Sequence, residues 1–304
     1  MDRRLIISLL CLIAPSFTAL AQPAVKKVLP VHVLVVIAHP DDESTLSVTL
    51  YKIAKEQGGI VDLFVITNGE AGFKYSTLAE TYYGVQLTDE KTGRSRLPDI
   101  RKKELKNAGR VLGVTNYYFC DQRDDKYCLD EKSSMDSCWA TANIHAKLVT
   151  LLSHHHYDFL FCLLPDAAEH GAHKAASILA LRAVASLPAE KRPCILGVRT
   201  RNKTDSSRQF SGYSNYEETK PIENEALFKV DRTTGFSYQN KINYKVIANW
   251  EIAEHKSQGA TQMTMNDGDL EEFWYFRQNG KEGVEKCAAL FRSLEMPPYI
   301  SKGY

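Results

Sequence analysis

The sequence predicts an α/β protein: a Rossmann-like open, mostly parallel sheet with helices on both faces. Two observations support this fold. Short apolar segments rich in β-branched residues alternate with amphipathic segments over residues 31–198, and polar clusters follow the ends of the apolar segments. That order is typical of parallel strands joined by right-handed helical crossovers. We therefore expect residues 22–304 to form a single domain, with residues 200–304 as its C-terminal cap portion.

The elements follow in order along the chain. Residues 31–38 (VHVLVVIA) are almost entirely apolar, which is typical of a central strand buried on both faces. Similar segments predict further strands at 60–67, 115–120, 159–164 and 194–198. Helical patterns predict helices at 45–57, 100–112, 144–153, 173–186, 245–258 and 283–294. Two polar stretches that contain several tyrosines are predicted to be long loops, at 72–98 and 201–218.

The charge balance excludes few functions. The chain has 304 residues with 38 Lys+Arg against 37 Asp+Glu, a formal net charge of +1. A protein without a charge surplus has no general electrostatic attraction to nucleic acid or to an anionic membrane, so we expect neither as a partner.

The N-terminal segment has the pattern of a secretory signal peptide. A charged start, Asp2-Arg3-Arg4, precedes an apolar run at 5–13, and the small-residue sequence Ala19-Leu20-Ala21 follows. We expect residues 1–21 to be removed after Ala21 and the protein to be secreted or periplasmic. No apolar run of membrane-spanning length remains after that cleavage, so we expect no integral membrane segment.

The cysteines fit an oxidising compartment without specifying a metal site. Of the 7 cysteines, all but Cys11 follow residue 21, and their even number permits disulfides. Cys128 and Cys138 flank a polar segment and are the expected local bridge. No C-x-x-C motif occurs, so a zinc site built on thiolates is disfavoured.

Polar clusters follow three of the predicted strands. Residues 39–43 (HPDDE) follow the first strand, residues 68–70 (NGE) the second, and residues 166–173 the fourth. Because the carboxyl ends of parallel strands meet at one edge of a sheet, we expect these side chains to lie around a common site.

Two pairs of residues in these clusters have the spacing of metal ligands. His39 and Asp42 are three residues apart on a tight turn, and His170 and His173 are three apart at the start of a predicted helix. Imidazole nitrogens with one carboxylate suit Zn²⁺, and three protein ligands leave a position open for water. Asp41 is a natural general base, and whichever of His170 and His173 is not a ligand can protonate the leaving group or stabilise an oxyanion. Together these residues predict metal-assisted hydrolysis of an amide or ester.

Short motifs extend this pattern over much of the chain. Residues 38–43 (AHPDDE) match the signature of the PIG-L (LmbE-like) deacetylases, and residues 170–173 (HGAH) match that family's second metal motif. Three further segments resemble its T-x-G-E-x-G turn, its R-x-x-E-L helix running into L-G-V, and its late H-x-S-Q element: residues 65–72, 100–114 and 255–258.

The resemblance implies a zinc-dependent hydrolase that removes the N-acetyl group from an N-acetylglucosamine-type sugar or conjugate. It implies that His39, Asp42 and His173 bind zinc, and that Asp41 activates the zinc-bound water. It further implies that His170 stabilises the oxyanion or acts as an acid. Arg101 becomes a candidate for binding substrate, and so does Glu70 in the second motif.

The chain departs from the family at one position. Relatives often have H-P-D-H where this chain has residues 170–173 (HGAH), so the acidic residue before the last ligand is missing. If that carboxylate orients a histidine in relatives, another group such as Asp166 or Glu169 must do so here. Asp166 is also a candidate for contact with substrate.

Two alternatives keep the same scaffold. In the first alternative, the protein is an amidase that cleaves a larger amide at the same site. In the second, it is a carbohydrate-binding protein that has lost catalysis. A pure binding protein has no need of a non-ligand carboxylate beside the metal, so Asp41 favours an enzyme. In either enzymatic case the expected partner is a small N-acetylated sugar or glycoconjugate.

Overall fold

The computed structural model describes residues 30–295, 297 and 298. The predicted signal peptide, residues 1–21, lies outside these residues. Seven strands form the main sheet in the order β3-β2-β1-β4-β5-β9-β6. Neighbours from β3 to β5 are parallel, whereas β9 is antiparallel to both β5 and β6. The strands are β1 (His32–Ile37), β2 (Ile60–Thr67), β3 (Asn116–Gln122), β4 (Phe159–Leu163), β5 (Cys194–Arg201), β6 (Phe228–Asp231) and β9 (Leu270–Tyr275).

The mostly parallel sheet and the predicted strands are therefore confirmed, with small shifts at the strand ends. Strand β1 shows why the apolar pattern was informative, since Val33 to Ile37 are all buried. Successive side chains of a strand point to opposite faces, so Leu34 and Val36 join one hydrophobic core, whereas Val33, Val35 and Ile37 join the other. A strand that supplies two cores is therefore apolar at most of its positions.

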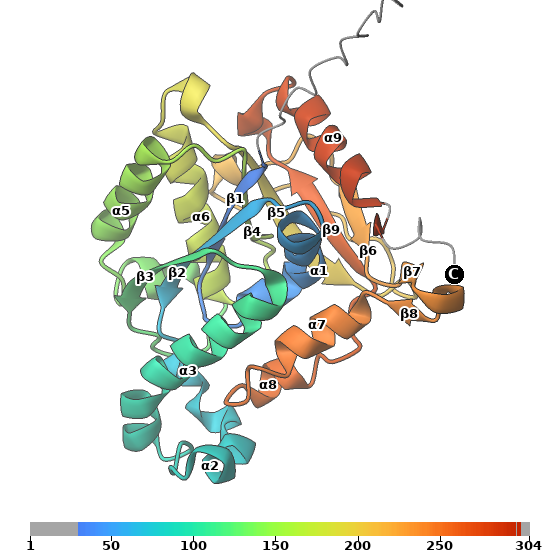
Figure 1. Cartoon of the computed structure of the whole chain (residues 1–304). Coiled ribbons are helices and arrows are strands. Elements are labelled where there is room, and N and C mark those ends of the chain that lie inside the picture. The colour runs from blue at the N-terminus through green and yellow to red at the C-terminus, as the bar shows by residue number, and fades with distance from the viewer. Residues whose placement is uncertain (1–29, 296, 299–304) are drawn as a thin grey trace, which may run out of the picture.

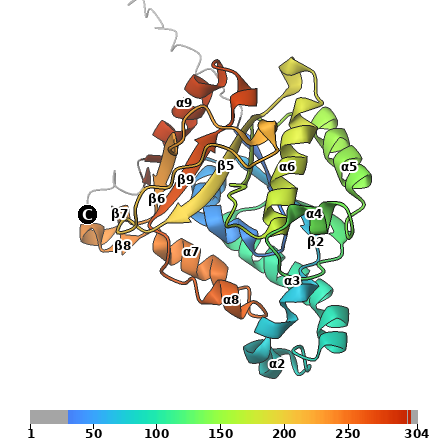
Figure 2. The same cartoon turned by 180° about the vertical axis from the view of Figure 1, so that it is seen from behind.

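Helices cover both faces of the sheet, as predicted (Figure 1). Residues from α5 (Thr141–His154) and α6 (Gly171–Ala185) complete one core. Residues from the helices on the opposite face complete the other core, and Figure 2 shows the same two layers from behind. Those helices are α1 (Ser47–Tyr51), α3 (Glu90–Leu112), α7 (Lys245–Ile252) and α9 (Gly283–Glu295).

The prediction of a long loop at 72–98 is wrong. This stretch contains the 3₁₀ helix η3 (Glu70–Tyr75), α2 (Thr77–Tyr83) and the first turns of α3. The Asp89 side chain accepts a hydrogen bond from the Thr92 N–H at 2.8 Å and caps α3. Only a few apolar residues of this stretch are buried, in a small separate core that includes Phe73 and Leu97, so the helical period is weak. The other predicted loop is confirmed, since residues 202–216 form no helix or strand.

Residues 200–304, expected as a cap portion, also extend the sheet. They supply β9 and β6 at one edge, and they place α7 and the short α8 (Gly259–Gln262) beside the end of β1. The predicted helix 45–57 is divided into η1 (Asp42–Leu46), α1 and the π-helical η2 (Lys52–Glu56). The remaining short elements are α4 (Glu131–Met135), η4 (Ala189–Lys191), η5 (Glu217–Thr219), β7 (Gly235–Phe236), η6 (Tyr238–Asn240), β8 (Ile242–Asn243) and η7 (Arg277–Asn279).

Two further expectations concern cysteines and membranes. The six cysteines among the described residues are free, so the expected Cys128–Cys138 bridge is not formed. Within residues 30–295, 297 and 298, no helix combines the length and the apolar character needed to cross a bilayer.

Candidate active site

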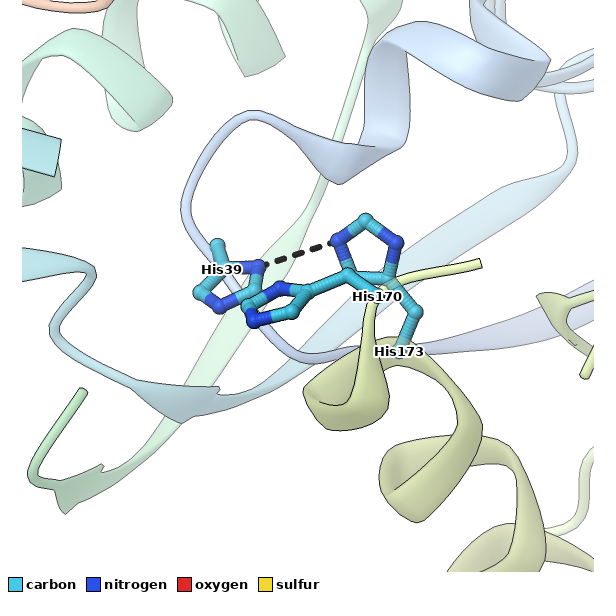
Figure 3. A group of neighbouring side chains, drawn as sticks. All are labelled: His39, His170 and His173. Atoms are coloured by element: carbon cyan, nitrogen blue, oxygen red, sulfur yellow. Dashed lines mark hydrogen bonds between the residues drawn. The ribbon is translucent and has the colours of Figure 1, made fainter. Parts of the chain in front are cut away.

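The candidate site lies where the strand order of the sheet reverses. Strands β2 and β3 continue from one side of β1, and β4 and β5 from the other. His39 follows β1, and His170 and His173 lie at the start of α6, which follows β4. In open α/β sheets this reversal leaves a crevice at the carboxyl ends of the strands. Figure 3 shows the three imidazoles meeting there, as the sequence predicts.

Asp42 is held by the backbone of its own turn. Its Oδ2 accepts hydrogen bonds from the N–H groups of Ala38 and His39, at 2.9 and 2.8 Å. Its Oδ1 is thereby directed toward the imidazoles, 3.4 Å from Nδ1 of His39 and 3.1 Å from Nε2 of His173. The carboxylate is oriented before any ligand arrives.

The same three residues fit a metal ion. Nδ1 of His39 and Nε2 of His173 are 3.1 Å apart, so the three candidate ligand atoms form a triangle with sides of 3.1, 3.1 and 3.4 Å. Tetrahedral zinc with bonds of about 2.0–2.2 Å separates neighbouring ligand atoms by about 3.3–3.6 Å. Spacing and donor chemistry therefore both suit a divalent ion held by His39, Asp42 and His173.

The outer nitrogens of both histidines face carboxylates. Nε2 of His39 is 3.7 Å from Oδ1 of Asp124, and Nδ1 of His173 is 3.7 Å from Oε2 of Glu169. Carboxylates in this position orient metal-binding imidazoles and raise their basicity. Glu169, one of two residues expected to orient a histidine, thus lies beside His173 rather than His170.

Asp124 was missed by the sequence reasoning. It follows β3, and the rule that functional groups gather at the carboxyl ends of parallel strands would have included it. The sequence does not distinguish Asp124 from the neighbouring Asp121 and Asp125, which are more exposed than Asp124 in the structure.

Neighbouring charges shift the pKa values of these groups. Burial lowers the pKa of His39, but Asp42 and Asp124 outweigh it and raise the value to about 10. Asp42 likewise outweighs burial at His173, whose pKa is raised to about 9. The pKa of Asp124 falls to about 2, because His39 outweighs the effect of burial on that carboxyl. Because a metal needs neutral imidazoles, its binding here competes with protons.

His170 occupies a different environment from the other two histidines. Its ring stacks on His39, with centroids 5.1 Å apart and planes 10° apart, and on Tyr127, at 4.8 Å and 16°. Its Nε2 lies 3.4 Å from the carbonyl oxygen of Lys126. Burial and the two neighbouring imidazoles lower its pKa to about 4. Aromatic stacking and a backbone carbonyl, rather than a carboxylate contact, hold this ring.

Asp41 lies beside the ligand set without belonging to it. Its Oδ1 is 2.7 Å from Nη2 of Arg101, and the hydroxyl of Thr261 donates to its Oδ2 at 2.6 Å. Arg101 is buried and also donates to the carbonyl of Gly69. Gly69 has φ +67°, and a Cβ there would collide with this guanidinium group. The turn at residues 65–72, which resembles the T-x-G-E-x-G motif, therefore leaves space for the Arg101 side chain to reach Asp41.

These groups line a cavity of about 460 Å³. Its wall includes Asp41, the three histidines, Arg101 and Arg199, with Tyr75 and Tyr127 at exposed positions. Glu70 and Asp166, the other candidates for substrate contact, do not line it. Asp166 instead pairs with Arg208, whose Nε lies 2.6 Å from Oδ2, and Glu70 is buried, which raises its pKa.

A second cluster of a histidine and carboxylates lies on the other side of the same turn. Nε2 of His255 is 2.7 Å from Oε1 of Glu43 and 3.0 Å from Oε1 of Glu251, and all three side chains are fully buried. Glu43 closes the AHPDDE motif, and His255 opens the H-x-S-Q segment. The cluster therefore ties the turn after β1 to the end of α7.

Comparison with known proteins identifies the domain. The PIG-L family, described as GlcNAc-PI de-N-acetylase, matches residues 34–184. These residues therefore form a PIG-L family domain. A curated relative from Bacillus cereus, a probable N-acetyl-alpha-D-glucosaminyl L-malate deacetylase 2, is 25% identical over 173 residues, 57% of this chain and 70% of the relative.

Two solved structures illustrate more distant likenesses of this PIG-L protein. An N,N'-diacetylchitobiose deacetylase from Pyrococcus horikoshii is 17% identical with a TM-score of 0.43, covering 81% of this chain and 83% of that one. A 4-carboxy-2-hydroxymuconate hydratase from Pseudomonas putida is 14% identical with a TM-score of 0.49, covering 80% and 95%. Likenesses this distant carry no argument about activity, so function must be argued from the site.

Proposed function

We propose that this PIG-L protein is a zinc-dependent deacetylase that hydrolyses the N-acetyl group of an N-acetylglucosamine-type sugar or conjugate. One observation carries the proposal. Asp41, a carboxylate outside the ligand triangle, lines the same cavity as His39, Asp42 and His173. A binding site for metal alone has no need of such a group, whereas hydrolysis needs a base. The family match and the curated relative's name support the choice of an N-acetyl amino sugar.

Each residue has a part in the proposed reaction. His39, Asp42 and His173 hold the ion, which when bound supplies Lewis-acid activation of water and of the amide carbonyl. Asp41 accepts a proton from the attacking water, while Arg101 and Thr261 keep its two oxygens in place. His170, whose lowered pKa leaves it neutral, donates a hydrogen bond to the oxygen of the reacting carbonyl, and the proton taken up by Asp41 passes to the leaving amine. Breaking the amide C–N bond yields acetate and a free amine.

The place of action is part of the proposal. The charged start, the apolar run and Ala19-Leu20-Ala21 support export to the periplasm or the medium, with cleavage after Ala21. Sequencing the N-terminus of the protein recovered from its native compartment tests this step. A mature chain that begins at Gln22 is expected.

Acetate release tests the reaction itself. Protein loaded with Zn²⁺ is expected to release acetate from an N-acetylated amino sugar, to lose this activity with a chelator, and to regain it when Zn²⁺ is restored. Release of a longer acyl or peptide group in place of acetate would favour the amidase alternative. Sugar binding without release from any substrate would favour the catalytically inactive alternative.

A further inference from the structure

The basic groups around the cavity already face acidic groups of the protein. Among the described residues, Arg101 and Arg199 are the guanidinium groups that line it, and no lysine does. Nη2 of Arg101 is 2.7 Å from Oδ1 of Asp41, and Nη1 of Arg199 is 3.0 Å from Oε1 of Glu169. Each guanidinium group therefore forms an ion pair with a carboxylate of the protein itself, although Nη1 of Arg199 makes no hydrogen bond among the described residues.

The cavity in fact has more acidic than basic groups. Asp41, Asp42, Asp124 and Glu169 all line it, and the two guanidinium groups neutralise only part of that charge. A divalent ion on neutral imidazoles would balance the remainder. A carboxylate or phosphate on the substrate would then enter a crevice whose guanidinium groups already form ion pairs with carboxylates, and a charge without a partner of its own is costly to desolvate.

The exposed residues of the cavity wall include two aromatic ones, Tyr75 and Tyr127. Tyr127 lines the cavity, and its side chain is 71% exposed. One face of its ring stacks on His170. The stack of Tyr127 on His170 and of His170 on His39 leads from the metal ligands outward. A flat ring of this kind, supported from behind, offers an apolar face with a polar rim. Such a face suits the C–H surface of an uncharged sugar ring.

We propose that the group attached to the reacting N-acetyl sugar is an uncharged sugar ring that stacks on Tyr127, and that the protein discriminates against conjugates with an acidic aglycone. This inference rests on the deacetylase function proposed above and adds its substrate class. Tyr127 is thus a specificity-determining residue, which acts by contact with the second ring.

Three probes separate this inference from the proposed function. N,N′-diacetylchitobiose has an uncharged second ring, N-acetylglucosamine has none, and N-acetyl-α-D-glucosaminyl L-malate has carboxylates. With the zinc-loaded protein, initial acetate release should give a kcat/KM for the disaccharide about tenfold above that for either other probe. A preference for the malate conjugate would overturn the inference while supporting the function. Absence of acetate from all three would overturn the proposed function, and the inference with it.

Variants of Tyr127 test the contact. Tyr127→Ala should reduce the disaccharide-to-monosaccharide ratio of kcat/KM by about fivefold or more, whereas Tyr127→Phe should keep it, because the ring face remains. Tyr238→Ala is the matched control, since Tyr238 is exposed but does not line the cavity. Calorimetry of the disaccharide with metal-free protein gives a readout without turnover, and Kd should rise only in Tyr127→Ala. An unchanged ratio and an unchanged Kd in that variant would overturn the proposal.

Discussion

Two clusters of histidine and carboxylate lie on either side of one turn, and they differ in access. His39, Asp42 and His173 border the cavity, whereas Glu43, Glu251 and His255 are fully enclosed. Two adjacent residues thus differ in role: Asp42 belongs to the cluster that a ligand can reach, and Glu43 belongs to the enclosed cluster. The same side-chain chemistry has one role where a ligand can enter and another where it cannot.

Their outer contacts differ as well. None of the outer nitrogens, Nε2 of His39, Nδ1 of His173 and Nδ1 of His255, makes a hydrogen bond among the described residues. The first two nonetheless face a carboxylate oxygen at 3.7 Å, and no such ion pair is found at Nδ1 of His255 within the described residues. Metal-binding imidazoles are normally supported on the nitrogen away from the ion. We therefore assign the metal to the open cluster and a structural role to the closed one.

Removing a ligand should have the largest effect. His39→Ala is expected to lower metal affinity by more than about 100-fold, the upper range for loss of a supporting residue, and to abolish acetate release. Elemental analysis of the purified protein checks the metal content. His154→Ala, at the exposed end of α5, is the control and should keep its metal. Unchanged metal content in His39→Ala would refute the ligand assignment.

Removing the base should separate catalysis from metal binding. Asp41→Asn keeps the shape of the side chain but cannot accept the proton, so kcat should fall by about 10²–10⁴-fold. Metal content should stay the same, because Asp41 is outside the ligand triangle. Steady-state kinetics with elemental analysis on the same sample provide the check. Full activity in Asp41→Asn would mean that another group is the base.

The closed cluster should govern stability. His255→Ala leaves Glu43 and Glu251 buried without their partner, and breaking a buried ion pair costs about 3–5 kcal/mol. Urea unfolding should show this loss, while metal content of the folded fraction is retained. Lys256→Ala, at a partly exposed neighbour, should change stability little. Loss of metal without loss of stability in His255→Ala would reverse our assignment of the two clusters.

A smaller effect should appear in the pH dependence of stability. Burial raises the pKa of Glu251 to about 8, so the folded protein keeps a proton that the unfolded chain releases above about pH 4.5. The folded state then binds more protons in this window, and stability falls as pH rises from about 4.5 to 8. Glu251→Gln should flatten the decline in melting temperature, and Glu254→Gln should not. An equal slope in Glu251→Gln and the unmodified protein would contradict this account.

Local patterns predicted the parallel strands and the two pairs of candidate ligands, His39 with Asp42 and His170 with His173. The strands can be recognised in the sequence because the central strands carry mostly apolar residues on both faces. The pairs of candidate ligands can be recognised because side chains three residues apart on a turn or at a helix start point in a similar direction. The helices within residues 72–98 could not be recognised in the sequence, because few of their residues are buried in a core and the apolar helical pattern is therefore weak.

The sequence alone determined which residues stand at the ends of β1 and β4, and its resemblance to the PIG-L family is what singled out His173 rather than His170 as the third expected ligand beside His39 and Asp42. Tertiary structure decided what surrounds them. Arg101 approaches Asp41 from α3, Asp124 approaches His39 from the end of β3, and His255 approaches Glu43 from beyond α7. The physical reason is distance along the chain. Spacing encodes contacts within a turn, whereas contacts between remote segments depend on how the helices pack against the sheet.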